Sequence, residues 1–304
     1  MAASPEKIST MKNTYPILEF DPASHAIIEP KHLIAPIDTP EHCVICFFQD
    51  VFRQLLADGK LKLLSERRSE IGAHPVYELD MEGRRLAAFH PGVGAPLAAG
   101  LLDEVIALGC KKFIACGGAG VLNREIAIGH LVAPTSAVRD EGTSYHYLPP
   151  GREVSASPEG VAAIEAALKV DGIDYIVGKT WTTDGIYAIP QKSLCKDVPA
   201  AVQLRRRQSN CRRNPGRKAS FAVLRIYRET PDKVKLRKEE GCVTVEMEAA
   251  AFFAVARFRG VTFAQILYGG DNLDSEKWDS RHWDKRTSIR EKLFCLAAKA
   301  CLKL

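Results

Sequence analysis

One segment, residues 85–116, limits the possible folds more than any other part of the sequence. An apolar stretch, Arg85–Phe89, is followed by a glycine-rich loop at 90–96, a helical pattern over about 96–108 and a second apolar stretch, Lys112–Cys116. Leucine, valine and isoleucine recur at helical spacing in the middle part, and the two flanking stretches have the character of strands. A strand, a loop, a helix and a second strand in this order are typical of an α/β protein.

The rest of the chain continues the alternation of strands and helices. A second glycine-rich loop, 117–120, follows the strand that ends at Cys116. Strands are further predicted at 43–48, 76–79, 130–138, 174–183, 243–245 and 262–268, and helices at 50–57, 158–169 and from Ser288, whose capping-box partner is Glu291. This pattern predicts a three-layer α/β/α domain with a central mixed sheet, in which the loops after the strands form the site.

The domain organisation has two unusual parts. A proline-rich N-terminal arm, 1–39, precedes a single domain over 40–304, and a basic stretch at about 188–227 interrupts that domain. The stretch holds ten Lys or Arg against one acid, a local charge of +9 in a chain whose net charge is +5. It lacks helical or alternating periodicity, so two interpretations stay open: a retained intron, or a genuine insert that binds RNA or another polyanion.

Composition favours a cytoplasmic protein. With 46% hydrophobic and 26% charged residues, the chain can bury a large core. It has no apolar run of the roughly 18 residues that span a bilayer and no signal-peptide pattern at its start. The nine cysteines lie mostly in apolar stretches, which fits reduced thiols. Cys43 and Cys46 have no second pair at zinc-finger spacing, so we expect no metal site.

The Met247-Glu248 pair is the strongest candidate for chemistry. It lies where a strand, Val243–Val245, leads into an apolar helix. A glutamate at such a junction can accept hydrogen bonds from two vicinal sugar hydroxyls, and the methionine supplies an apolar wall. The alternative is that Glu248 only complements the positive end of the helix dipole.

Several motifs in order carry a resemblance to a known family. They are Gly92-Val93-Gly94, Cys116-Gly117-Gly118-Ala119, the stretch Arg139–Tyr147, and Met247-Glu248. Together they resemble the nucleoside phosphorylase superfamily, which includes purine nucleoside phosphorylases, uridine phosphorylases and nucleosidases. The resemblance covers about 40–304 without the basic stretch, and Arg139–Tyr147 looks most like uridine phosphorylases. It implies an enzyme that cleaves the N-glycosidic bond of a nucleoside, a pentosyltransferase.

The resemblance also implies roles for individual residues. Glu248 binds the ribose hydroxyls, Met247 packs against the sugar, and Asp271 protonates a purine leaving group unless it is only a turn aspartate. Glu248 and Asp271 are therefore the catalytic candidates. The remaining substrate-binding candidates are Gly94, Cys116, Gly117, Gly118, Arg139 and His146. The alternative for Arg139 is a structural ion pair with Asp140. The alternative for His146 is a place in an interface.

The phosphate site departs from the family pattern. The arginines that phosphorolytic members use are absent near Phe47 and before Cys116, and the Gln-x-Arg pair that holds uracil is not evident. The substitutes considered are a partner subunit's cation, Arg84, Arg85, Lys111 or Lys112. We therefore expect a homo-oligomeric phosphorylase with phosphate as co-substrate, no cofactor and an undetermined base. A hydrolase that uses water and a non-catalytic nucleoside-binding protein are the alternatives. Nucleic acid is expected as a partner only if the basic stretch is genuine.

Overall fold

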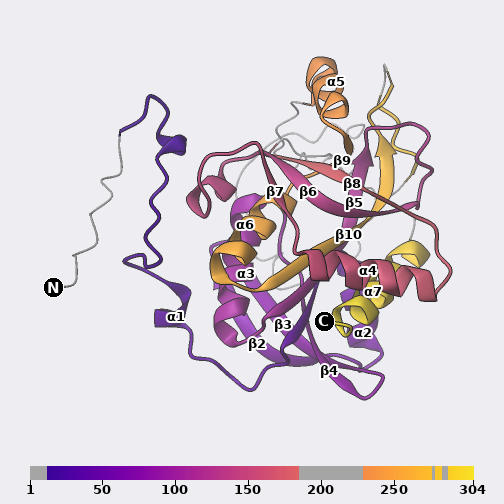
Figure 1. Cartoon of the computed structure of the whole chain (residues 1–304). Coiled ribbons are helices and arrows are strands. Elements are labelled where there is room, and N and C mark those ends of the chain that lie inside the picture. The colour runs from indigo at the N-terminus through magenta and orange to yellow at the C-terminus, as the bar shows by residue number, and fades with distance from the viewer. Residues whose placement is uncertain (1–11, 185–228, 276–277, 283–286) are drawn as a thin grey trace, which may run out of the picture. The chain divides into compact units, whose positions relative to one another are not determined.

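The computed structural model describes residues 12–184, 229–275, 278–282 and 287–304 (Figure 1). These residues belong to one compact unit, Met1–Asp184 with Glu229–Leu304. The predicted basic insert lies outside the described residues. In the arm, the described part contains a short 3₁₀ helix, η1 (Pro16–Leu18), and a single helical turn, α1 (Pro30–Leu33).

A mixed β-sheet forms the centre of this unit, as predicted. Its strands are β1 His42–Cys46, β2 Lys62–Ser69, β3 Gly72–Met81, β4 Arg84–Phe89, β5 Lys112–Val121, β6 Leu131–Asp140, β7 Glu153–Ser155, β8 Tyr175–Thr183, β9 Cys242–Glu246 and β10 Thr262–Asn272. β1 is parallel to both β4 and β5, and β5 is parallel to β10, so these four strands end at the same edge. The pairs β2–β3, β3–β4, β5–β9 and β6–β10 are antiparallel.

The sheet also closes on itself, which the sequence did not predict. β5 pairs with β1, β9 and β10, and β10 continues through β6, β8 and β9 back to β5. The closure depends on the second half of β5, where Gly120 lies opposite Val245 and Gly118 opposite Tyr268. This half contains the glycines predicted to form a loop at 117–120, and that prediction was wrong. A closed ring has no free edge, so it protects these strands from pairing with other chains.

Helices cover the sheet in two layers (Figure 1). α3 (Ala95–Leu108) and α6 (Ala249–Arg259) pack together on one side. α2 (Gln49–Ala57), α4 (Pro158–Val170) and α7 (Thr287–Cys301) pack together on the other. The predicted three-layer α/β/α architecture is therefore confirmed. None of the helices in the described part of the chain is long and apolar enough to cross a membrane.

Side chains from the helices and the sheet interlock in the core. The rings of Phe252 in α6 and Phe263 in β10 stack with their centroids 4.9 Å apart. Phe52 of α2 meets Phe294 of α7 edge to face at 6.5 Å. Phe52 also meets Tyr77 of β3 at 5.8 Å, so aromatic contacts join both helix layers to the sheet.

Several further elements depart from the sequence prediction, among them the strands β2 and β7, which were not predicted. α5 (Pro231–Glu239) was not predicted; it starts at an N-cap, Thr230, whose side chain accepts a hydrogen bond from the Lys233 amide. α7 begins one residue earlier than expected, so Ser288 lies inside its first turn and is not the N-cap of the predicted capping box.

Candidate active site

Glu248 links the starts of two helices. It is the N-cap residue of α6, its side chain is only 5% exposed, and its Oε1 accepts a hydrogen bond of 2.6 Å from the Gly94 amide. Gly94 is the N-cap residue of α3 and has a φ of +94°, which favours glycine. Met247 lies close by, since its Cε is 3.9 Å from where a Cβ on Gly94 would be. The structure therefore brings Gly94, Met247 and Glu248 together.

Glu246 caps the helix next to Glu248 and was missed by the sequence reasoning. Its Oε2 accepts hydrogen bonds from the Glu248 amide at 2.7 Å and the Ala249 amide at 2.6 Å. Its Oε1 accepts one from the Thr182 hydroxyl at 2.5 Å. Glu246 is therefore the acid that complements the positive end of the α6 dipole, the role that was considered as the alternative for Glu248. The sequence signal that could have revealed it is an acid directly before a helix.

Burial changes the acidity of this carboxyl pair. It raises the pKa of both Glu248 and Glu246, and for Glu248 the repulsion from Glu246 adds to the effect. The Gly94 amide acts in the opposite direction, since it stabilises the ionised form of Glu248. A proton is thus retained in the pair at higher pH than an exposed glutamate would hold it.

Asp271 lies at the end of β10, with its carboxyl inside the protein. It is 4% exposed, and its Oδ2 accepts a hydrogen bond of 2.7 Å from the Trp278 indole. Burial raises the pKa of Asp271 to about 7, although the Trp278 N–H lowers it. An acid that titrates near neutrality is suited to general acid catalysis, and this environment differs from that of a surface turn aspartate.

Gly120 connects the surroundings of Asp271 with the strand that leads to Glu248. A Cβ placed on Gly120 would lie 3.5 Å from Oδ1 of Asp271 and 3.0 Å from Cγ1 of Val245. Val245 is followed within three residues by Glu248. The ends of β5, β9 and β10 therefore meet in one region, and the two catalytic candidates come from two of these ends.

The Cys116-Gly117-Gly118 run contributes backbone to this region. The Cys116 thiol is fully buried, and burial raises its pKa well above the ordinary value, so its side chain belongs to the core and only its backbone is available to this region. Gly118 is the exposed position of the otherwise buried strand β5. A Cβ at Gly118 would lie 3.0 Å from the Tyr268 ring, so only glycine leaves the backbone open there.

Phe47 covers the neighbouring glycine. Its ring would lie 3.1 Å from a Cβ on Gly117, and it meets the His90 ring edge to face at 6.2 Å. His90 in turn shapes the first glycine-rich loop, because its Nδ1 accepts a hydrogen bond of 3.0 Å from the Gly92 amide. Both aromatic residues lie between the two glycine-rich segments.

The structure gives Arg139 a structural role. Its guanidinium donates to the Ser144 hydroxyl at 2.9 Å and to the Leu148 and Pro149 carbonyls at 3.2 and 2.7 Å. It also lies 4.2 Å from the centroid of the Tyr145 ring. The alternative considered for Arg139, a structural role, is thus supported, although its partners are these loop groups and not Asp140.

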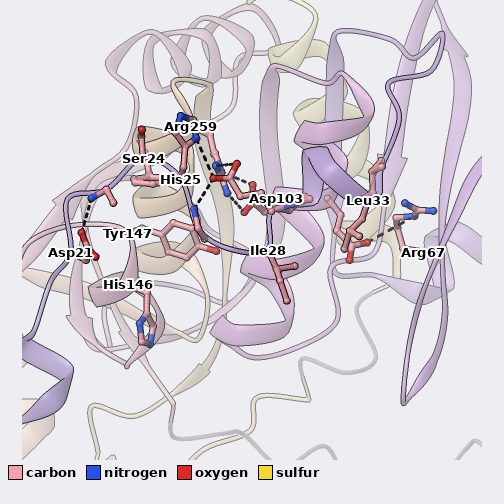
Figure 2. A pocket seen from close by; sticks show the side chains of 18 of the residues that line it. Asp21, Ser24, His25, Ile28, Leu33, Arg67, Asp103, His146, Tyr147 and Arg259 are labelled. Atoms are coloured by element: carbon pink, nitrogen blue, oxygen red, sulfur yellow. Dashed lines mark hydrogen bonds and ion pairs between the residues drawn. The ribbon is translucent and has the colours of Figure 1, made fainter.

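His146 lies at a different cavity. It is exposed, and it lines a cavity of ≈ 740 Å³ between the N-terminal arm and helices α3 and α6 (Figure 2). In that cavity Arg259 makes a two-pronged ion pair with Asp103, with both bonds at 2.7 Å. Glu248 is not among the lining residues. The structure therefore does not place His146 beside the proposed ribose site.

The cations considered as phosphate ligands lie at the wrong end of the sheet. They are at or just before the first residues of β4 and β5, opposite the ends that lead to the glycine-rich segments: Arg84, Arg85, Lys111 and Lys112. Arg85, for example, is paired with Asp38 at 3.0 Å and Glu78 at 2.8 Å.

A different cation, Arg290, lies at the correct end of the sheet. Its guanidinium is 3.0 Å from Asp50 in the first turn of α2 and lies over the ring of Phe48, the residue that precedes this helix. No local motif marks Arg290, because it joins the site only through the packing of α7 against α2.

The fold is that of an α/β protein with buried carboxylates at the ends of its strands. The sequence profile of the phosphorylase superfamily matches residues 41–211 and 216–303, so the chain belongs to this superfamily, as the resemblance implied. The uridine phosphorylase of Thermococcus kodakarensis is 30% identical over 156 residues, 48% of this chain and 56% of that protein. The guanosine phosphorylase of Halorubrum lacusprofundi is 25% identical over 210 residues, 69% of this chain and 70% of that protein. The chain spans about half the length of the uridine phosphorylases it matches.

Solved structures share the fold. The purine nucleoside phosphorylase of Toxoplasma gondii superposes with a TM-score of 0.64 at 19% identity, over 88% of this chain and 92% of that one. The AMP nucleosidase of Bacteroides thetaiotaomicron superposes with a TM-score of 0.60 at 19% identity, over 88% and 89%. These likenesses support the architecture.

Proposed function

We propose that this protein cleaves the N-glycosidic bond of a purine nucleoside and transfers the pentose to phosphate. The observation that carries the proposal is the buried carboxylate of Glu248, held by the Gly94 amide beside Met247. One oxygen of Glu248 is engaged by the protein, which leaves the other to accept hydrogen bonds from sugar hydroxyls. The guanosine phosphorylase relative, as named, acts on a purine nucleoside, which agrees with an acid at position 271.

The arrangement supplies both functions that the reaction needs. As the bond to the base breaks, positive charge develops on the sugar, and Glu248 stabilises that charge in its ionised form, which the Gly94 amide favours. Asp271 gives its proton to the departing purine, and a pKa of about 7 keeps a large fraction of it protonated at neutral pH. The exposed backbone of Gly118 lies where the acceptor can approach the sugar.

Hydrolysis is the second candidate, and a specific contact favours it. The Phe47 ring covers Gly117, the segment that the family resemblance places beside the phosphate. As the acceptor, water needs less space beside Gly117 than phosphate does, and it needs no cation to bind it. Arg290, by contrast, is a cation at the correct end of the sheet, where it would favour phosphate only if the anion shares it with Asp50, its partner at 3.0 Å.

One experiment tests the function and separates the candidates. Purified protein is incubated with purine and pyrimidine nucleosides, with and without phosphate, and the free base and ribose 1-phosphate are measured. Cleavage of purine nucleosides that requires phosphate and yields ribose 1-phosphate supports the proposal, whereas equal cleavage without phosphate supports hydrolysis. If nucleosides bind without cleavage, the protein is a non-catalytic binder and the proposal fails.

A further inference from the structure

Trp278 has an unusual position for a large aromatic residue. Its side chain is 49% exposed, yet its indole N–H donates to the buried Oδ2 of Asp271 at 2.7 Å. The segment that carries Trp278 is tied back to β10, since Asn272 and Asp279 exchange backbone hydrogen bonds of 2.9 and 3.3 Å. Trp278 is thus held at the mouth of the Asp271 site by contacts on the residue that follows it.

The backbone after Trp278 is also constrained. Arg281 and His282 both have positive φ angles, 46° and 51°, which are uncommon for residues with side chains. The Arg281 guanidinium donates to the Ile126 carbonyl at 2.7 Å, which anchors this turn to the body of the protein. The turn after Trp278 is therefore held by the Arg281 contact, and the residue next to Trp278 by the Asn272–Asp279 backbone bonds.

The hydrogen bond determines which oxygen of Asp271 can hold a proton. An indole N–H is a donor only, so the oxygen that it contacts must act as an acceptor. In the neutral acid the carbonyl oxygen is the stronger acceptor, so the indole contact on Oδ2 favours the tautomer with the proton on Oδ1. Oδ1 faces Gly120, where β5 and β9 meet. The proton is thus directed to the region that leads to Glu248.

We propose that Trp278 is a positioning residue for the general acid, and that its indole N–H directs the transferable proton of Asp271 onto Oδ1. This inference rests on the proposed function, because it assigns Asp271 the role of acid. Trp278 itself transfers no proton. Its contribution is to orient the carboxyl group and to favour the protonation state with the proton on one oxygen.

The charged groups around Asp271 fix the direction of the expected pH effect. Among the described residues, burial is the largest cause and raises the pKa of Asp271, as does Asp279, while the Trp278 N–H, the Asp271 backbone amide and Arg281 lower it. Removal of the N–H therefore raises the pKa of Asp271 further. The acid acts in its protonated form, so in a plot of kcat against pH the fall at high pH should move to higher pH. The maximal kcat itself should fall.

The test compares three variants with the unmodified protein. Trp278→Phe keeps an aromatic ring but loses the donor, and we expect kcat for a purine nucleoside to fall about tenfold, with little change in KM and an upward shift of the high-pH limb. Trp278→His keeps a ring N–H. It should recover part of kcat and return the high-pH limb of the kcat profile to its original pH. Trp181→Phe is a control for the loss of an indole donor, because the Trp181 indole donates to the Asp140 carboxylate at 3.0 Å; since Trp181 is fully buried, its free energy of unfolding is measured in parallel.

Two readouts distinguish failure of this inference from failure of the proposed function. If Asp271→Asn cleaves purine nucleosides at the original rate, Asp271 is not the acid and the proposed function is wrong on this point. If Asp271→Asn is inactive but Trp278→Phe keeps the original kcat and pH limb, the inference is overturned. The pKa of Asp271, measured by carbon-13 NMR without substrate, should rise in Trp278→Phe; an unchanged pKa contradicts the inference even if no nucleoside is cleaved.

Discussion

Glu246 and Glu248 lie two residues apart and have different roles because the chain turns between them. Glu246 points back to the helix end, where it accepts the amides of Glu248 and Ala249. Glu248 points across to the Gly94 amide of the other helix. Sequence alone shows two acids with similar spacing from the helix, and only the paths of their side chains separate the structural acid from the proposed ligand.

Substitution of each glutamate should therefore have a different effect. Glu248→Gln replaces one carboxyl oxygen with an amide NH2 that cannot accept hydrogen bonds from the sugar hydroxyls, so we expect kcat/KM for the nucleoside to fall about 100-fold or more with little loss of stability. Glu246→Ala leaves two helix amides without their acceptor and should lower the free energy of unfolding by about 2 kcal/mol. Urea unfolding and steady-state kinetics measure both, with the exposed Glu125→Gln as control. Full activity of Glu248→Gln would refute the ribose assignment.

Asp271 should make stability depend on pH. Its folded-state pKa is about 7 against an ordinary value of 3.8, so the folded protein binds this proton more tightly than the unfolded chain. The stabilisation from this group is fully present below about pH 4 and is lost as the pH rises to about 7, a change of up to about 4 kcal/mol. Asp271→Asn should flatten this part of the profile when urea unfolding is compared at pH 5 and pH 8. Parallel profiles for the two proteins would contradict the raised pKa.

At the level of elements, the sequence predicted strands and helices well where each carries its own pattern. The strand Arg85–Phe89, the helix that follows it and the Met247-Glu248 junction all have local signals, and the structure contains them. The glycines at 117–120 were misread because glycine usually interrupts a strand. Here the rings of Phe47 and Tyr268 pack over them, and these rings come from distant parts of the chain. Trp278 and Arg290 likewise reach the site only through tertiary packing.

The loop between β4 and α3 should tolerate no side chain at Gly94. Gly94→Ala is expected to lower the free energy of unfolding by about 1 kcal/mol or more, because its φ of +94° is unfavourable for alanine. It should also reduce nucleoside cleavage strongly, since the amide that holds Glu248 would move. Thermal unfolding measures the loss of stability, and steady-state kinetics measure the loss of nucleoside cleavage. Gly59→Ala is the matched control: it has a positive φ of 68° with open space around it, so it should lose stability but keep activity. Equal activity of both variants would argue against the Gly94–Glu248 contact as part of the site.

At the level of the whole molecule, the described fold is complete around the position of the basic stretch. β8 ends at Thr183 inside the ring of strands, and α5 resumes at Pro231 with its own N-cap. Lys233 of α5 is paired with Asp140 of β6 at 3.1 Å, so the chain after the stretch is anchored to the same sheet as the chain before it. Among the described residues, which exclude 185–228, the contacts of the proposed site form without the basic stretch.

Deletion of 188–227 should therefore preserve both folding and nucleoside cleavage. A shorter connection between β8 and α5 loses less entropy on folding, so the variant should be more stable than the full chain, by up to about 2 kcal/mol. Urea unfolding and the nucleoside assay measure this, and a variant that is insoluble or inactive would show that the stretch contributes to the fold or the site.

The two chains should also be compared for binding of single-stranded RNA at low and high salt. Because ten of the basic residues lie in this stretch, RNA binding that is lost both with salt and with the deletion would identify it as a genuine polyanion-binding insert. If the full chain binds no RNA and is less soluble and less active than the shortened one, the retained-intron interpretation is favoured, because the fold then gains nothing from these residues.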